Sequence, residues 1–119
     1  MENLMVYNNR ASQGSGGAVF IRSYRTTSNS WSSLSRCHFM NNNAGQGSGG
    51  AIYISMDISS GNALIIMDNN FNGNTAYSFG GAIYVNGTRS SVNMTGSNFI
   101  NNRAMTQGGG SYILQWTIY

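Results

Sequence analysis

The chain repeats one pair of short motifs along its length, and this repeat constrains its fold more than any other feature. A Phe-x-x-Asn-x-Ala motif is followed about ten residues later by Gly-Gly and an apolar segment. The first motif starts at positions 6, 39, 71 and 99, with Val in place of Phe at position 6, so successive starts are 33, 32 and 28 residues apart. A period of roughly 30 residues is typical of solenoids. We therefore expect residues 1–119 to form a single repeat array, as a fragment of a longer solenoid.

Composition narrows the fold class further. Only 8% of the residues are charged and 40% are hydrophobic, which disfavours disorder because disordered chains combine low hydrophobicity with high net charge. Asn, Ser and Gly dominate the polar residues, and these residues are poor helix formers. Long helices are therefore not expected.

Short strand-like segments lie between turn residues. Residues 63–68 and 91–95 are rich in apolar and β-branched side chains and are bounded by Gly and Asn. Each repeat has room for three such strands, one before the Phe, one through it and one after Gly-Gly. Three strands and three turns in roughly 30 residues fit one coil of a parallel β-helix, in which coils stack about 4.8 Å apart. We predict an all-β, right-handed parallel β-helix (solenoid) of about four coils.

Stacking the repeats aligns three kinds of side chain. Asn tolerates left-handed backbone geometry at turns, and stacked Asn amides form hydrogen-bonded ladders. The Phe residues are expected to point inward and stack, and the Ala residues to fill a tight corner. The predicted ladder consists of Asn9, Asn42, Asn74 and Asn102, the Phe column of Val6, Phe39, Phe71 and Phe99, and the Ala column of Ala11, Ala44, Ala76 and Ala104. The single cysteine, Cys37, lies two residues before Phe39 and is expected to be a small inward side chain.

The orientation of the strand after Gly-Gly follows from its alternation. One set of alternate positions is aliphatic until the last repeat and is assigned to the interior; it contains Val19, Ile52, Ile83 and Tyr112, with Ile21, Ile54, Val85 and Leu114. The other set then exposes Phe20, Tyr53 and Tyr84 as an aromatic ladder. The opposite orientation stays open, because the small Ala18, Ala51 and Ala82 also suit a crowded interior.

The linked motifs resemble the repeats of the chlamydial polymorphic outer membrane proteins, a pattern shared with many right-handed β-helix proteins of bacteria and protists. The resemblance rests on Phe-x-x-Asn-x-Ala followed by Gly-Gly-Ala-Ile-Tyr and covers nearly the whole chain. It implies a surface-exposed passenger or ectodomain involved in adhesion, located outside the cell or at the cell surface, and at the outer membrane if the source is bacterial. The signal sequence and membrane barrel of such proteins are not found in this chain.

Several functional classes are disfavoured by the residues themselves. Some right-handed β-helices cleave acidic polysaccharides with clustered carboxylates, but only Glu2, Asp57 and Asp68 are acidic here, and no two share a repeat position. We therefore expect no catalytic residue, metal or cofactor. The six arginines are dispersed, which disfavours a nucleic-acid partner. No apolar stretch is long enough to span a membrane.

Two functions are consistent with the repeat. The first is a non-catalytic, adhesin-type surface module that contacts a protein or glycan on a host or neighbouring cell. The alternative is a carbohydrate-binding module in which Phe20, Tyr53 and Tyr84 stack on sugar rings, or a degenerate polysaccharide-active enzyme. Asn86 and Asn93 lie in N-glycosylation patterns, which matter only for a secreted eukaryotic chain. Because a short β-helix exposes unpaired strand edges at both ends, we also expect end-to-end self-association.

Overall fold

The computed structural model describes residues 1–23, 31–56, 63–88 and 91–116, and these residues form strands and turns without a helix. Within these ranges, no helix is long and apolar enough to cross a membrane. The strands form four parallel sheets. Their members are β1 (Met5–Tyr7), β5 (His38–Met40), β9 (Asn70–Asn72) and β13 (Asn98–Ile100); β2 (Arg10–Ala11), β6 (Asn43–Ala44), β10 (Thr75–Ala76) and β14 (Arg103–Ala104); β3 (Val19–Ser23), β7 (Ile52–Met56), β11 (Ile83–Thr88) and β15 (Ser111–Trp116); and β4 (Trp31–Ser35), β8 (Ala63–Met67) and β12 (Ser91–Thr95).

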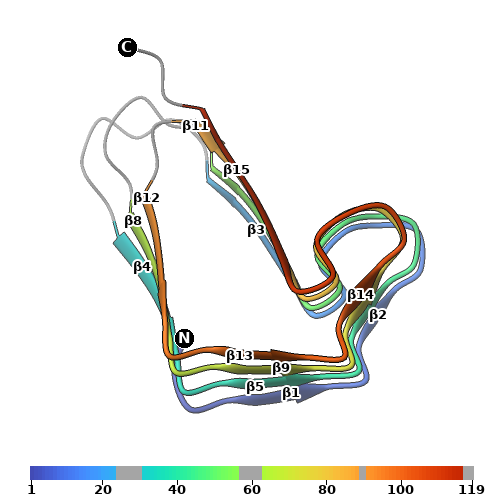
Figure 1. Cartoon of the computed structure of the whole chain (residues 1–119), viewed down its shortest axis with the longest axis horizontal. Coiled ribbons are helices and arrows are strands. Elements are labelled where there is room, and N and C mark those ends of the chain that lie inside the picture. The colour runs from blue at the N-terminus through green and yellow to red at the C-terminus, as the bar shows by residue number, and fades with distance from the viewer. Residues whose placement is uncertain (24–30, 57–62, 89–90, 117–119) are drawn as a thin grey trace.

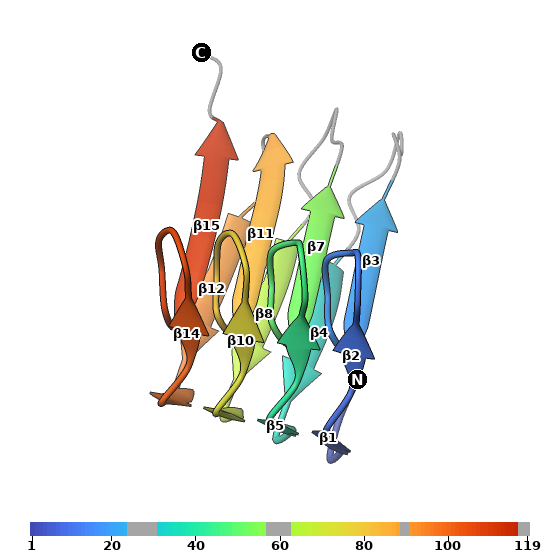
Figure 2. The same ribbon diagram turned by 90° about the vertical axis from the view of Figure 1, so that its right-hand side faces the viewer.

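The sheets are the walls of a coiled chain. We call the strands of one turn a rung, so that rung 1 contains β1–β3, rung 2 β4–β7, rung 3 β8–β11 and rung 4 β12–β15. Figure 1 looks along the stack and shows the walls enclosing a common interior, and Figure 2 shows the rungs side by side. Every pairing between rungs is parallel, as in a β-helix. The predicted all-β, parallel β-helix fold is confirmed.

A column of aromatic rings fills the interior next to the wall of β1, β5, β9 and β13. Phe39 and Phe71 are fully buried, and their ring centroids lie 5.1 Å apart with the planes 6° from parallel. The centroid of Phe99 follows 4.9 Å from that of Phe71. Val6 takes the same position in rung 1 and packs partly buried against the core. Because the repeat places a Phe at the same position in rungs 2, 3 and 4, each ring of the column packs against another ring of the same shape.

The asparagine ladder links the rungs at the turn after the Phe column. Nδ2 of Asn9, Asn42 and Asn74 donates to Oδ1 of the asparagine in the next rung at 3.0, 3.0 and 2.9 Å. The same Oδ1 atoms accept the backbone N–H groups of Asn9, Asn42 and Asn74 at 3.1, 3.0 and 2.9 Å. Nδ2 of Asn42, Asn74 and Asn102 also donates to the backbone carbonyls of Val6, Phe39 and Phe71. Asn42 and Asn74 therefore use both donors and both acceptor lone pairs of their amides while fully buried.

The left-handed residue of this turn is the one before the ladder asparagine, so the expectation that the ladder positions themselves adopt this geometry was wrong. Positive φ occurs at Asn8, Asn41, Gly73 and Asn101, with values of 57°, 54°, 67° and 53°. The left-handed residue turns the chain sharply and directs the next side chain inward, where its amide reaches the neighbouring rungs. The glycine at position 73 is the sequence signal for this, since glycine enters this region without steric cost.

The turn before the Phe column also has a left-handed residue followed by an inward side chain. Its left-handed residues are Asn3, Arg36, Asp68 and Gly96. The next position points inward, and there Asn69 Oδ1 accepts the backbone N–H of Cys37 at 2.9 Å while Asn69 Nδ2 donates to the Leu34 carbonyl at 2.8 Å. The thiol of Cys37 is fully buried and lies 3.2 Å from the Ser35 carbonyl. Cys37 is thus a small inward residue, as the repeat alignment predicts.

The two glycines of each Gly-Gly pair are required for different reasons. Gly49 has a φ of 68°, a conformation that side chains with a Cβ rarely adopt. A Cβ on Gly50 would overlap the backbone carbonyls of Gly81 and Thr75, because the loop passes directly over the corner strand of the next rung. The pair therefore allows the loop to fold back against the wall of β2, β6, β10 and β14.

The strand after Gly-Gly has the predicted orientation but a different register in rung 4. Ile52, Ile54, Ile83 and Val85 are buried, as assigned, and Ala51 and Ala82 are also buried where the loop covers the start of the strand. Ile83 pairs with Ser111 and Tyr84 with Tyr112, so Tyr112 continues the aromatic positions instead of the aliphatic ones. The predicted alignment was one residue out because it matched Gly109-Gly110 to the glycine pair. The left-handed glycine of rung 4 is Gly108, nine residues after Phe99, just as Gly80 is nine after Phe71.

The ladder predicts a large difference between two neighbouring asparagines. Replacing Asn74 with Ala removes the acceptor shared by the backbone N–H and Nδ2 of Asn42, and it removes one donor each from the Phe39 carbonyl and from Asn102 Oδ1. We expect a loss of about 3 kcal/mol of unfolding free energy. Asn72→Ala, on the half-buried position of β9, is the matched control and should cost less than about 1 kcal/mol. Urea denaturation followed by circular dichroism measures both. Equal midpoints would show that the ladder does not contribute to stability.

The glycine pair predicts a second contrast. Gly50→Ala should destabilise the fold by more than about 2 kcal/mol, because its Cβ has no space between two backbone segments. Gly14→Ala should be close to neutral, since nothing lies within 4 Å of a Cβ at that position. Thermal melts of the two variants test this, and a tolerated Gly50→Ala would contradict the close approach of loop and corner strand.

Candidate functional site

The predicted aromatic ladder exists as a stack, which we call the aromatic column. Ring centroids of Phe20 and Tyr53 lie 4.9 Å apart with planes 7° from parallel, and those of Tyr53 and Tyr84 lie 5.1 Å apart at 14°. The flat faces of these rings therefore cover each other. Because a sugar stacks on the face of an aromatic ring, most of the surface that such a ligand needs is already occupied.

Exposure of the aromatic column falls from rung to rung, and the expectation that all three rings face solvent was wrong for Tyr84. Phe20 is 56% exposed and Tyr84 only 8%. The ring of Phe79, in the loop between β10 and β11, lies 6.3 Å from that of Tyr84 and helps to cover it. The side chains of β11 alternate as predicted. The alternation does not, however, predict that the loop between β10 and β11 covers the outer face of the strand.

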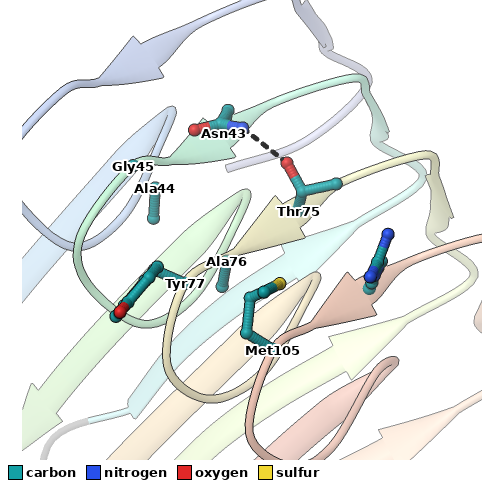
Figure 3. A pocket seen from close by; sticks show the side chains of 8 residues that line it. Asn43, Ala44, Gly45, Thr75, Ala76, Tyr77 and Met105 are labelled. Atoms are coloured by element: carbon teal, nitrogen blue, oxygen red, sulfur yellow. Dashed lines mark hydrogen bonds between the residues drawn. The ribbon is translucent and has the colours of Figure 1, made fainter.

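A shallow groove, here called the corner groove, lies instead on the outer side of the wall formed by β6, β10 and β14. Its volume is about 230 Å³, and it is lined by Asn43, Ala44, Gly45, Thr75, Ala76, Tyr77, Arg103 and Met105. These residues come from three successive rungs, with the polar ones before the Ala column and the larger apolar ones after it. Figure 3 shows Tyr77 and Met105 projecting from the segments that leave β10 and β14.

The groove combines apolar contact area with hydrogen-bonding groups and a positive charge. Tyr77 and Met105 are 59% and 62% exposed, respectively. Asn43 Nδ2 donates to Thr75 Oγ1 at 2.6 Å, as drawn in Figure 3, so the threonine hydroxyl keeps its own hydrogen for a ligand. Arg103 is exposed at the same edge. An aromatic ring and a thioether beside an amide, a hydroxyl and a guanidinium favour a ligand with both apolar and polar or anionic parts.

Sequence reasoning missed the corner groove because its residues occupy variable repeat positions. The residue after the Ala column is Ser12, Gly45, Tyr77 or Met105, depending on the rung. No column of like residues marks this position. The sequence signal for the groove is the change, at the position after the Ala column, from small side chains in the first two rungs to large ones in the last two. The neighbouring Ala column is buried in the middle rungs.

The remaining candidate positions are dispersed over the molecule. Asn86 is half-buried in β11 and Asn93 is exposed in β12. His38 is exposed on β5, on the opposite side of its strand from the interior. Among the described acidic residues, Glu2 forms an ion pair with Arg36, and Asp68 occupies a left-handed turn; Asp57 and Arg89 lie outside the described residues.

Two segments of the chain match the repeat of a known protein family. Residues 37–55 and 70–86 match the Chlamydia polymorphic membrane protein (Chlamydia_PMP) repeat. These two segments run from the start of the Phe column to the strand after Gly-Gly in rungs 2 and 3, which are the best-buried rungs. The chain is therefore a parallel β-helix in which two segments match the repeat of this family, and the resemblance read from the sequence is confirmed for these two segments. The match associates it with surface-associated outer membrane proteins. Searches found no curated protein and no solved structure that matches the chain.

Proposed function

We propose that this β-helix segment is a non-catalytic, adhesin-type module that contacts a protein or glycan on a host or neighbouring cell. The observation that carries the proposal is the corner groove, where two large apolar side chains, Tyr77 and Met105, stand exposed beside Asn43, Thr75 and Arg103. Exposed aromatic residues and arginine are enriched where surfaces bind partners. The repeat family adds support, because it belongs to membrane proteins.

The non-catalytic part of the proposal is supported by the placement of the acidic side chains. Most glycoside hydrolases use two carboxyl groups that flank the bond they cleave. Glu2 is engaged with Arg36, and none of the described residues that line the corner groove carries a carboxylate. The groove is thus suited to binding, with one positive charge and neutral donors and acceptors.

Carbohydrate binding is the second candidate function, and the Asn43–Thr75 pair favours it. An amide and a hydroxyl held 2.6 Å apart offer fixed hydrogen-bonding groups beside the exposed ring of Tyr77, which is the combination that orients a sugar while the ring contacts its face. Under this proposal the sugar contacts Tyr77, and the covered faces of the aromatic column are not used.

The binding role of the corner groove is tested by removing its two large apolar side chains. The double variant Tyr77→Ser/Met105→Ser should bind cultured epithelial cells about tenfold more weakly than the native chain when each is coupled to fluorescent beads. Tyr7→Ser is the matched control, because Tyr7 is 57% exposed on β1 in a different wall. The same three proteins on a glycan array separate a sugar from a protein ligand.

Each outcome bears on the proposal. Loss of binding in the groove variant with retention in the control supports the corner groove as the contact surface. An equal loss in both variants would show that exposed apolar area is responsible wherever it lies. Native beads that do not bind cells or glycans would overturn the adhesin-type function.

A further inference from the structure

The polar side of the corner groove is a column of hydrogen-bonding groups that includes a positive charge. Asn43, Thr75 and Arg103 hold the same position in successive corner strands, because β10 pairs with β6 on one side and with β14 on the other. Asn43 Nδ2 donates to Thr75 Oγ1, so the threonine hydroxyl directs its own hydrogen away from the asparagine. The guanidinium of Arg103 has donors and no acceptor. From Thr75 to Arg103, the groove therefore selects a ligand with hydrogen-bond acceptors.

The charge of Arg103 is not balanced by any carboxylate of the described residues. Glu2 forms an ion pair with Arg36, and Asp68 lies in the turn between β8 and β9. The other residues that line the groove are neutral. Arg103 is exposed, and because strand side chains stand roughly perpendicular to the sheet, it faces outward whether or not another rung follows. An anionic group is therefore the electrostatic complement of this side chain.

The other side of the groove offers the face of an aromatic ring. Tyr77 is 59% exposed, and Met105 lies beside it in the next rung (Figure 3). No described ring stacks on Tyr77, in contrast to the covered rings of the aromatic column. The groove holds about 230 Å³, which is less than the roughly 300–1,000 Å³ of sites for drug-sized ligands. It therefore fits one sugar unit rather than several.

The middle corner strands have no free backbone groups for a peptide. β10 pairs with β6 and β14, and β6 also pairs with β2. An extended peptide that adds to a sheet gains its affinity from main-chain hydrogen bonds to an unpaired strand. Because β6 and β10 are paired on both sides, the groove recognises its ligand through side chains alone. A ring face, a hydroxyl and a charge are then the available contacts.

We propose that the corner groove binds a sugar that carries a carboxylate, as the terminal unit of a glycan. The sugar ring lies against Tyr77, a ring oxygen or hydroxyl accepts from Thr75 Oγ1, and the carboxylate pairs with Arg103. Adjacent strands are about 4.8 Å apart, so one pyranose unit reaches both polar contacts. A guanidinium binds a planar carboxylate through two parallel hydrogen bonds. This inference rests on the carbohydrate-binding form of the proposed function and adds the charge of the ligand.

Pairs of sugars that differ only in charge test the proposal. Methyl glucuronide is compared with methyl glucoside, and methyl sialoside with its methyl ester, so that uronic and sialic acids are distinguished as sources of the carboxylate. In heteronuclear NMR titrations of the whole chain, the amide signals of Thr75, Tyr77 and Met105 should shift. At least one acid should bind about tenfold more tightly than its neutral partner. Added salt should reduce this preference, because it screens the ion pair with Arg103.

Two arginines of the same outward column provide the variant and its matched control. Arg103→Gln and Arg10→Gln each remove one exposed arginine and lower the net charge of +3 by one. Only Arg103 lines the groove. Arg103→Gln should reduce the affinity for the acid to that for its neutral partner, whereas Arg10→Gln should keep the preference. Circular dichroism checks that both variants are folded.

The outcomes separate this inference from the proposed function. Equal binding of acids and neutral partners would overturn the carboxylate preference and leave carbohydrate binding in place. No binding of any of the four sugars would overturn both the inference and the carbohydrate-binding function. A preference that survives Arg103→Gln, or that is lost equally in Arg10→Gln, would also overturn the inference, because the acid would then respond to a different site or to net charge.

Discussion

Hydrogen bonding by the asparagine ladder is the interaction on which the stack depends. Chain reversal at a corner removes backbone groups from the regular strand pairing, and an unpaired buried donor or acceptor costs about 1–3 kcal/mol. The ladder amides replace these partners at the same corner of successive rungs, with both donors and both lone pairs of Asn42 and Asn74 in use. The corner can therefore be buried, and the Phe column can begin only three residues away. A shorter or apolar side chain at this position would leave several groups unsatisfied at once.

Register between the rungs follows from this arrangement. Parallel pairing alone permits sliding, because a strand displaced by two residues keeps its alternation. A ladder asparagine finds its partner only in one register, and the stacked rings of Phe39 and Phe71 match only in that same register. Polar and apolar columns thus specify one alignment together. The number of residues between β3 and β4 can then differ from that between β7 and β8 without a shift of the strands.

How much of the structure could be predicted depended on whether neighbouring rungs carry like residues. The Phe, Asn and Ala columns are self-similar, so the sequence alignment predicted the walls and the interior. The alignment failed in rung 4, where three consecutive glycines at 108–110 offered two equivalent matches and only the backbone φ of Gly108 distinguishes them. It also failed for Tyr84, since alternation describes a strand and not the loop that covers it. The corner groove was missed because Tyr77 and Met105 occupy a position where each rung carries a different residue.

These results divide the repeat into two kinds of position. The Asn and Phe columns are uniform inside the stack, because each of these side chains uses the one above and the one below as its partner. Outward columns have no such requirement, and the corner strands show it, with Arg10, Asn43, Thr75 and Arg103 in one column. Differences between rungs are readily tolerated at such outward positions, so recognition can evolve there with little loss of stability.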